Sequence, residues 1–525
     1  MKIIRIVLMV SVVTTMQSLS CMEMTFGTLL ENYKRFIQFD NRVAVLPSLF
    51  HRITSFDEKN QNEMVSYAQG TYPLIHSEVI KLCDNFITFK MQEGSNVEKA
   101  LYKNMTVASF ITRCFKKRPL TFCTSEDNAL LRDGTVCNDD NNALVDFAKI
   151  GADDQVVEGE ALLPLKKYIS YEEMQISALL GISSPTRFIN DGNRYNKGNV
   201  AKQNTFQEYG IYSGLVGARF EKQGLMEWQH IIITETQNVE ANGYGLEKCD
   251  KGSLKLWSEF YGCKFPTLAE AKKDSSNKYI LLGESKFYFN TEVYKKRIRY
   301  VIEPFLLDAN KRGKAASKQV YVYAVAIGLG VWAIEKKIQT KCMIEVYKDI
   351  ISSNDLKYIA DIDFAYFDED SLALKANTLV EGMSDGSLVR VKDADHCIKI
   401  HFSKNNPAKK LEGSDSNKLL VASYAWDGAS YPGNEFFSNS LSASGDPAAA
   451  CCSSISWLQN IGINTCIKWY IINTFGIEEE KMNLKKQQEY LQSLINLKTG
   501  ISYLAGASVL AILCYSLYYM IKNNK

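Results

Sequence analysis

The segment QVYVYAVAIGLGVW at residues 319–332 is followed by AIEKKIQTKCMIEVYKDII at 333–351 and KYIADIDFAYF at 357–367. The first run is apolar and rich in β-branched residues, which is typical of a buried strand, and its glycines predict a loop. The second run has the spacing of a helix, and the third predicts another strand. This order is that of a βαβ unit, so the region predicts an α/β fold with parallel strands.

Further strands and helices are predicted on both sides of this unit. We expect further strands in IKIHF (398–402), KLLVASYAW (418–426), IYSGLVGARFE (211–221) and EWQHIIITETQN (227–238). Helices are predicted in SYEEMQISALLG (170–181), in NTEVYKKRIRYVIEPFLLDANKRG (290–313), and from the start of DPAAACCSSISWLQN (446–460). Together these elements predict the α/β class, with a mixed sheet flanked by helices.

The N-terminal part has a different character. From Phe26 to about Lys117, apolar residues recur every three or four positions, which predicts helices. An acidic, asparagine-rich stretch at 133–160 is typical of a surface loop, and we place a domain boundary near residue 155. The expected organisation is a helical region at 21–155 and a ligand-binding and catalytic region at 156–475.

Both ends of the chain are apolar. Residues 1–20 resemble a secretory signal peptide, and residues 501–521 carry no charge over a length that can span a bilayer. The charged segment at 476–500 predicts a stalk helix before this anchor. We therefore expect an exported protein that contacts the membrane through a single C-terminal transmembrane helix.

The composition excludes several classes of function. The 525 residues include 61 basic and 59 acidic side chains, so no overall field attracts nucleic acid, and nucleic-acid binding is not expected. The 13 cysteines lack paired C-x-x-C spacing and there are only 5 histidines, so we expect no metal site. No cofactor is expected.

The clearest candidate site is the loop LLVASYAWDGASYPGNEFFSNSLSASGDPAAACCSSI at 419–455. It follows a predicted strand and carries three carboxylates, Asp427, Glu435 and Asp446. Ligands of open α/β sheets bind at the carboxyl ends of strands. Each acid also has a structural explanation: Asp446 precedes Pro447 as a helix N-cap would, Asp427 could begin a turn, and Glu435 could be a solvated loop charge.

Two further loops could contact a ligand. Gly328 and Gly330 would let backbone N–H groups approach an anion closely. The loop TRFINDGNRYNKG (186–198) contains Asn190 and Arg194, with Arg219 a short way on. This loop is either a network of Asx turns or a polar clamp in which an arginine meets phosphate.

Carboxylates in such a loop could hydrogen-bond sugar hydroxyls, hold an attacking water, or stabilise an oxocarbenium-like ribose. This pattern is expected for hydrolysis of an ADP-ribosyl linkage. The same residue types would equally suit a protein that only binds a sugar or nucleotide.

Four segments carry a resemblance to a known family: VYAVAIGLGVW (322–332), YAWDGASYPGNEFF (424–437), SASGDPAAACC (442–452) and IYSGLVGARFEKQGLMEWQ (211–229). They resemble the MavL-like bacterial effector family over roughly residues 160–475. The resemblance implies a macrodomain-like core and an ADP-ribosylhydrolase that binds ADP-ribose and removes it from a modified protein, in that family ubiquitin.

The resemblance also implies roles for individual residues. The acidic catalytic residues would be Asp427, Glu435 and Asp446, and the loop with Gly328 and Gly330 would bind phosphate. The remaining expected ligand contacts are Trp332, Trp426, Gly428, Tyr431, Asn434, Arg219, Asn190 and Arg194. Two alternatives stay open, a non-catalytic reader of ADP-ribose or a related nucleotide, and a membrane-anchored protein that binds a host factor.

Overall fold

The computed structural model describes residues 24–36, 58–123, 125–137, 147–152, 163–196, 198–249, 252–283, 286–367, 379–392, 395–438, 451–467 and 474–475. The expected signal peptide (1–20), stalk helix (476–500), transmembrane helix (501–521) and Asp446 lie outside these ranges. Within them, we find no helix with the length and apolar character needed to span a membrane.

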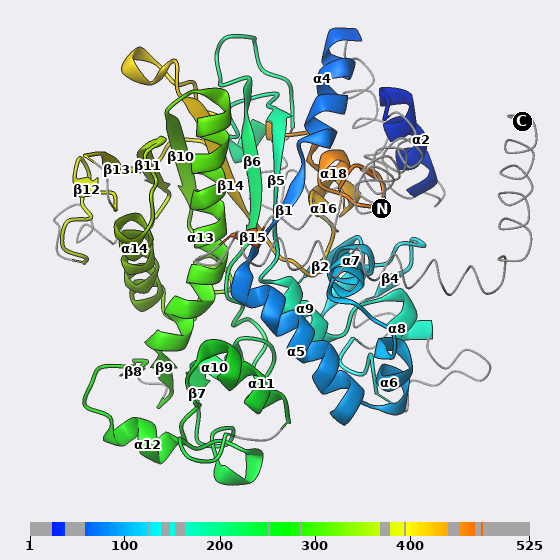
Figure 1. Cartoon of the computed structure of the whole chain (residues 1–525), viewed down its shortest axis with the longest axis vertical. Helices are drawn as coiled ribbons and strands as arrows, with labels where there is room; N and C mark the ends of the chain where they lie inside the picture. The colour runs from blue at the N-terminus through cyan, green and yellow to red at the C-terminus, as the bar shows by residue number, and fades with distance from the viewer. Residues whose placement is uncertain are drawn as a thin grey trace, which may run out of the picture.

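A large mixed sheet forms the centre of the molecule (Figure 1). Across the described residues it has nine strands in the order β12-β13-β11-β10-β14-β6-β5-β1-β15. Their bounds are β1 Tyr72–His76, β5 Gly181–Arg187, β6 Tyr209–Val216, β10 Val320–Val325, β11 Ile359–Ala365, β12 Leu388–Arg390, β13 Cys397–Ser403, β14 Leu419–Trp426 and β15 Thr474–Phe475.

The middle of this sheet is parallel. Strands β13, β11, β10, β14 and β6 run in the same direction, while β12 and β5 pair antiparallel with their neighbours. Strands β10 and β14 are buried along most of their length, which matches their continuous apolar sequences. The prediction of an α/β fold with a mixed sheet is confirmed, and so is the βαβ unit formed by β10, α14 and β11.

Helices flank this sheet. Their bounds are α2 Phe26–Phe36, α4 Glu58–Gln69, α5 Ser77–Glu93, α6 Asn96–Tyr102, α7 Val107–Lys116, α8 Leu163–Lys167, α9 Tyr171–Ser177, α10 Trp228–Ile231, α11 Gly252–Tyr261, α12 Leu268–Lys273, α13 Thr291–Ala316, α14 Lys336–Ser353, α16 Asn434–Ser438 and α18 Ile455–Leu458. Helix α13 is capped by Asn290, whose side chain accepts a hydrogen bond from Val293 N, and it crosses the sheet in contact with β1, β6, β10 and β14 (Figure 1).

Two small antiparallel sheets lie outside the central one. The first is β2-β3-β4, with bounds Thr121–Cys123, Asn128–Leu130 and Val136–Cys137. The second is β7-β9-β8, with bounds Ile232–Ile233, Tyr288–Asn290 and Tyr279–Leu281. It packs near α10, α11 and α12 in a separate lobe at the bottom of Figure 1.

The expectation of a strand throughout 227–238 is wrong. The segment begins as helix α10, and only Ile232–Ile233 pairs as a strand. Trp228, His230 and Ile231 are all buried. A short run of buried apolar residues has no periodicity that separates helix from strand, and here the tertiary packing decides.

Buried apolar residues form one main core that joins the N-terminal helices to the central sheet. It includes Phe110 of α7, Val322 of β10 and Ile362 of β11. Strand β1 also pairs with β5, so the sheet draws on residues on both sides of the boundary expected near 155. The boundary itself stays a prediction.

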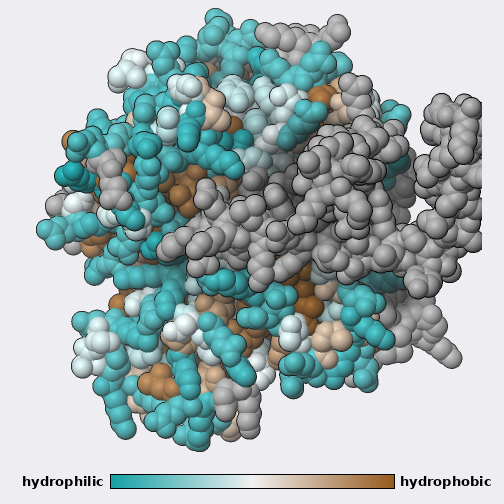
Figure 2. All heavy atoms as spheres, viewed as in Figure 1, coloured by the Kyte–Doolittle hydropathy of each residue, from teal (hydrophilic) through white to brown (hydrophobic). Residues whose placement is uncertain are grey.

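On the face seen in Figure 2, the described residues are mainly hydrophilic, with hydrophobic residues in small groups.

Candidate functional site

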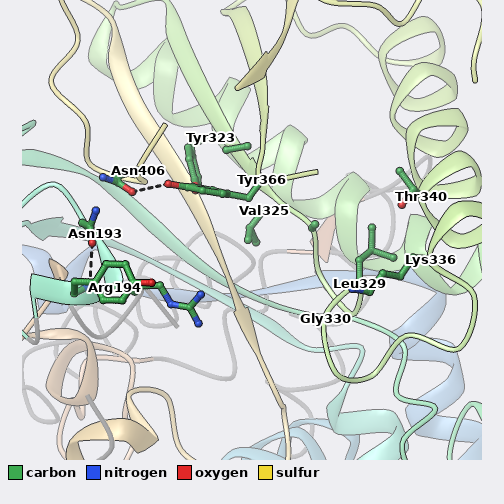
Figure 3. Close-up of a pocket in the computed structure, with 14 residues that line it drawn as sticks. Asn193, Arg194, Tyr323, Val325, Leu329, Gly330, Lys336, Thr340, Tyr366 and Asn406 are labelled. Carbon is green, nitrogen blue, oxygen red and sulfur yellow. Dashed lines mark hydrogen bonds between the residues drawn. The ribbon is translucent and has the colours of Figure 1, made fainter. Parts of the chain in front are cut away.

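A cavity of about 550 Å³ opens at the carboxyl ends of β10 and β11 (Figure 3). This volume lies in the range of small-molecule sites, and the edge is where open α/β sheets bind ligands. The lining residues come from the loop after β5, from β10 and its following loop, from α14, and from the ends of β11 and β13. They are Gly192, Asn193, Arg194, Tyr195, Tyr323, Val325, Ala326, Leu329, Gly330, Lys336, Thr340, Ala365, Tyr366 and Asn406.

Two cationic side chains line the cavity. Arg194 reaches it from the short 3-10 turn Arg194–Asn196, and Lys336 is the first residue of α14. Figure 3 shows Arg194 near Tyr366 at one end and Lys336 near Gly330 at the other. None of the described residues that line the cavity is acidic. The cavity therefore suits a negatively charged ligand.

Asp191 organises the loop that presents Arg194. Its Oδ1 accepts hydrogen bonds from Asn193 N at 3.1 Å and Asn196 Nδ2 at 2.7 Å. Its Oδ2 accepts one from Asn406 Nδ2 at 2.7 Å, and the Tyr366 hydroxyl donates to Asn406 Oδ1 at 2.9 Å. The loop is therefore an Asx network, and the same hydrogen bonds hold Asn193 and Arg194 in the wall of the cavity.

Aromatic rings stand at the rim of the cavity. Tyr195 and Tyr366 leave 79% and 52% of their surfaces exposed, although both line the cavity. Tyr366 adopts a φ of 56°, which few residues other than glycine adopt, and its backbone N–H bonds to Ser403 O at 2.9 Å. Exposed rings held in this way are available to stack on a planar ligand group.

Asn190 and Arg219 are not among the residues that line the cavity. Asn190 is fully buried, donates to Asn199 O at 2.8 Å and accepts from Gly192 N at 2.8 Å. Arg219 is 5% exposed and its guanidinium bonds to Glu221, with shortest distance 3.0 Å. Its guanidinium carbon lies 5.8 Å from the ring centroid of Trp332, so those two predicted contacts lie side by side, and neither lines the cavity.

The glycine loop after β10 connects the cavity to Arg219. Gly328 has a φ of 70°, and a Cβ added at Gly217 would lie 2.3 Å from Gly328 N. The loop therefore rests directly on the end of β6, where only glycine permits the approach. Gly330 lines the cavity, and the Trp332 carbonyl accepts a hydrogen bond from Phe220 N at 3.2 Å.

Asp427 follows β14, and its carboxylate accepts four hydrogen bonds. Oδ1 accepts from Ala429 N and Ser430 N, both at 2.7 Å. Oδ2 accepts from Ser430 Oγ at 2.5 Å and Asn434 Nδ2 at 2.9 Å. Burial raises the pKa of Asp427, while the hydrogen bonds from Ser430 and Ala429 and the charge of Arg118 oppose this increase.

The other predicted residues of this loop are mostly packed inside. Trp426 donates to Ser430 O at 3.2 Å, and the Tyr431 hydroxyl donates to Lys116 O at 2.7 Å. Gly428 has a φ of 69°. Glu435 is buried in the first turn of α16, next to Asn434. None of these residues lines the cavity.

Strand order places Asp427 at the same edge of the sheet as the cavity. The cavity lies over β11 and β10, and β14 is the next strand after β10. Neighbouring strands lie about 4.8 Å apart, so the loop that begins at Asp427 starts at the same edge of the sheet, at the end of the strand next to β10. Ser423 Oγ of β14 also accepts a hydrogen bond from Val325 N at 3.0 Å, which joins the two strand ends.

Several cavity residues were absent from the sequence prediction. They are Tyr195, Tyr323, Lys336, Thr340, Tyr366 and Asn406. Tyr366 directly follows β11 and Lys336 starts the helix after the glycine loop, so the rule that ligands bind beyond strand ends could have found both. Among the described residues, no group of three or more His, Cys, Asp or Glu side chains is placed to hold a metal ion.

A family model described as ADP-ribosylhydrolase MavL-like matches residues 39–492. The chain belongs to this family. The MavL-like chain is also 34% identical over 427 residues to ADP-ribosylarginine hydrolase CG3568 of Drosophila melanogaster, with 79% of each chain covered. It is 33% identical over 421 residues to ADP-ribosylarginine hydrolase CG2909 of the same organism, covering 77% of this chain and 78% of that relative.

The family resemblance noted in the sequence is therefore confirmed, and the MavL-like family is one of hydrolases that act on ADP-ribosyl bonds. The match begins at residue 39, well before the region at 160–475 that carries the recognisable segments. It includes all three predicted catalytic carboxylates.

Proposed function

We propose that this chain binds ADP-ribose in the cavity and hydrolyses the bond between ADP-ribose and an arginine side chain of a modified protein. Two relatives carry the name ADP-ribosylarginine hydrolase, which favours arginine as the linkage. The observation that carries the proposal is the pairing of a cationic cavity with a buried carboxylate at the next strand end. In this proposal the α/β core is macrodomain-like.

The cavity suggests how ADP-ribose would lie. The pyrophosphate would sit between Arg194 and Lys336, with the backbone near Gly330 close to it. The adenine would stack on the exposed rings of Tyr195 and Tyr366. This arrangement leaves the distal ribose to extend across β10 toward Asp427.

Asp427 would then act on the anomeric carbon of the distal ribose. As an anion it would stabilise the oxocarbenium-like transition state or accept a proton from the attacking water. Hydrolysis forms a C–O bond to water, breaks the C–N bond to the guanidine, and returns a proton to the leaving nitrogen. Glu435 and Asp446 are proposed to assist, as the family resemblance implies.

Turnover on a panel of modified proteins tests this proposal. We expect release of free ADP-ribose from arginine-linked protein, and slower or no release from carboxylate-linked protein. Arginine-modified ubiquitin belongs in the panel, because ubiquitin is the proposed family substrate. Tight ADP-ribose binding by calorimetry with no release from any member would select a non-catalytic reader instead.

Export and membrane anchoring are also proposals. They rest on the apolar residues 1–20 and 501–521 alone. Protease protection in intact cells tests them, because an exported, anchored body is digested from outside and an internal one is not.

A further inference from the structure

Arg118 is fully buried directly behind the carboxylate loop. Its Nε donates to Cys114 O at 2.6 Å and its Nη2 donates to Ser177 Oγ at 2.6 Å. The guanidinium carbon lies 4.5 Å from the Phe115 ring centroid and 4.3 Å from that of Trp426. Among the described residues, Nη1 has no hydrogen-bond partner.

The charge of Arg118 is unusual among the buried arginines. Arg113 and Arg297 each form an ion pair with a buried glutamate, at 2.6 Å and 2.8 Å. Within the part of the chain that the structure describes, no carboxylate lies at ion-pair distance from Arg118. A buried charge without such a partner is costly to the fold, so stability alone does not explain this residue.

Arg118 contacts both sides of Asp427. Its guanidinium stacks on Trp426, the residue before Asp427. It also donates to Ser177, whose hydroxyl donates in turn to the Gly428 carbonyl at 2.7 Å. The residues before and after the carboxylate are therefore both fastened, directly or through one hydroxyl, to the same buried cation.

We propose that Arg118 is a positioning residue for the hydrolase reaction, which fixes the Asp427 loop and supplies the positive charge that keeps the Asp427 carboxylate ionised. This inference rests on the proposed function of Asp427. The buried charge of Arg118 destabilises the fold because it has no ion-pair partner among the described residues. We assign this charge to the site, since Asp427, the residue after Trp426, is a buried carboxylate that the charge can stabilise.

Electrostatics support the geometry. Burial raises the pKa of Asp427, and Arg118 acts against this increase. Burial lowers the pKa of Arg118 to about 10, so the guanidinium still carries its charge at neutral pH. Cys123 of β2 also interacts with Asp427. Burial raises the pKa of its thiol, and the charges of Asp427 and Glu221 raise it further.

Other charged and titratable groups lie in this region. Tyr424 and Tyr431 interact with Arg118, Arg132 interacts with Tyr431, Arg219 and Glu221 interact with Cys123, and Glu435 lies on α16. Arg219 is paired with Glu221, whereas Arg118 has no carboxylate at ion-pair distance among the described residues.

The pH profile of single-turnover hydrolysis tests the inference in the full-length protein. Arg118→Met and Arg118→Gln both remove the charge, and we expect the acid limb to move to higher pH by about 1 unit in each. At pH values below the wild-type limb midpoint, this shift gives about a tenfold loss of rate that recovers as the pH rises. Arg118→Lys keeps the charge and should restore the acid limb to its wild-type position.

Ser177→Ala is the matched control, because it removes the hydrogen bond to Gly428 and leaves the charge in place. It should lower the rate at every pH without moving the acid limb. An unchanged acid limb in both neutral variants would overturn the inference, and so would a shift in Ser177→Ala equal to theirs.

A second measurement does not depend on activity. In a double-mutant cycle of thermal stability at pH 7, Arg118→Met and Asp427→Asn should be non-additive, because each removes one charge of the electrostatic interaction between the two side chains. Additive effects would contradict a coupling between the two side chains. If the wild-type protein hydrolyses nothing, the proposed function fails, while this cycle still decides whether the charges are coupled.

Discussion

The side-chain amide of Asn434 donates a hydrogen bond of 2.9 Å to Asp427 Oδ2 and another of 2.9 Å to Ser430 Oγ. The first turn of α16 is thereby tied to the carboxylate that follows β14. These hydrogen bonds close residues 427–434 into a polar loop. A substitution at Asn434 should therefore alter the orientation of the Asp427 carboxylate.

Asn434→Ala should lower the single-turnover hydrolysis rate by about tenfold, because Asp427 loses a donor that holds its orientation. The free energy of unfolding should fall by about 1 kcal/mol. Rates and thermal melts measure the two effects. Asn242→Ala is the control: its amide bonds to Thr236 O and Gln237 O in an exposed turn, so it should leave hydrolysis unchanged.

Arg194→Ala and Lys336→Ala should each weaken ADP-ribose binding by about tenfold, because each removes a charge-assisted contact with the pyrophosphate. Calorimetry with free ADP-ribose measures this directly. Arg390→Ala removes a cation that is 74% exposed on β12 and should bind as the wild type does. Equal affinities in all four proteins would place the pyrophosphate elsewhere.

Gly217→Ala should displace the glycine loop, because its Cβ would meet the Gly328 backbone at 2.3 Å. We expect a loss of about 2 kcal/mol in stability and weaker ADP-ribose binding. Gly330→Ala is the matched substitution for thermal stability, since a Cβ added there would meet no atom of the described residues within 4 Å. A Gly217 variant that melts like the Gly330 variant and binds ADP-ribose like the wild type would show that the close approach is unimportant.

Glu303 should give the fold an acid-dependent stability. Burial alone would raise the pKa of Glu303, but hydrogen bonds from His76, Arg299 and Asn354 hold it at about 2. A lowered pKa means that the ionised form stabilises the fold: the contribution is complete above about pH 4.5 and disappears as the pH falls toward 2.

Glu303→Gln should therefore cost about 3 kcal/mol at pH 7, and the difference from wild type should narrow as the pH falls below about 4.5. Thermal melts at pH 7, 5 and 3 measure the trend. Glu259→Gln changes a carboxylate whose side chain is 56% exposed and should leave the pH dependence as in the wild type. A constant difference between Glu303→Gln and wild type at every pH would refute the assignment.

The sequence predicted the centre of the fold because its signals there are long and consistent. Strand β10, helix α14 and strand β11 have clear apolar patterns and glycine boundaries. Strand β5 was not predicted, because Gly181–Arg187 includes Ser183, Ser184 and Pro185 and is buried on both faces. Its place in the sheet is set by pairing with β1 and β6, which a local pattern does not encode.

The candidate site was predictable only in part. Loops beyond predicted strand ends identified Gly330, which lines the cavity, and Asp427, which follows the neighbouring strand β14. The polar, turn-rich loop at 186–198 identified Arg194, which also lines the cavity. Lys336 and Tyr366 follow the same rule but have no distinctive sequence signal. Arg118 could not have been found, because its ring contact with Trp426 joins residues more than 300 positions apart. The roles of the carboxylates stay predictions.

The most direct test is single-turnover release of free ADP-ribose from an arginine-ADP-ribosylated protein by the wild type and by Asp427→Asn. We predict release by the wild type, a rate at least about 100 times lower in Asp427→Asn, and similar ADP-ribose affinity in both proteins. Equal rates in the two proteins, or no release by a wild type that binds ADP-ribose, would contradict the account.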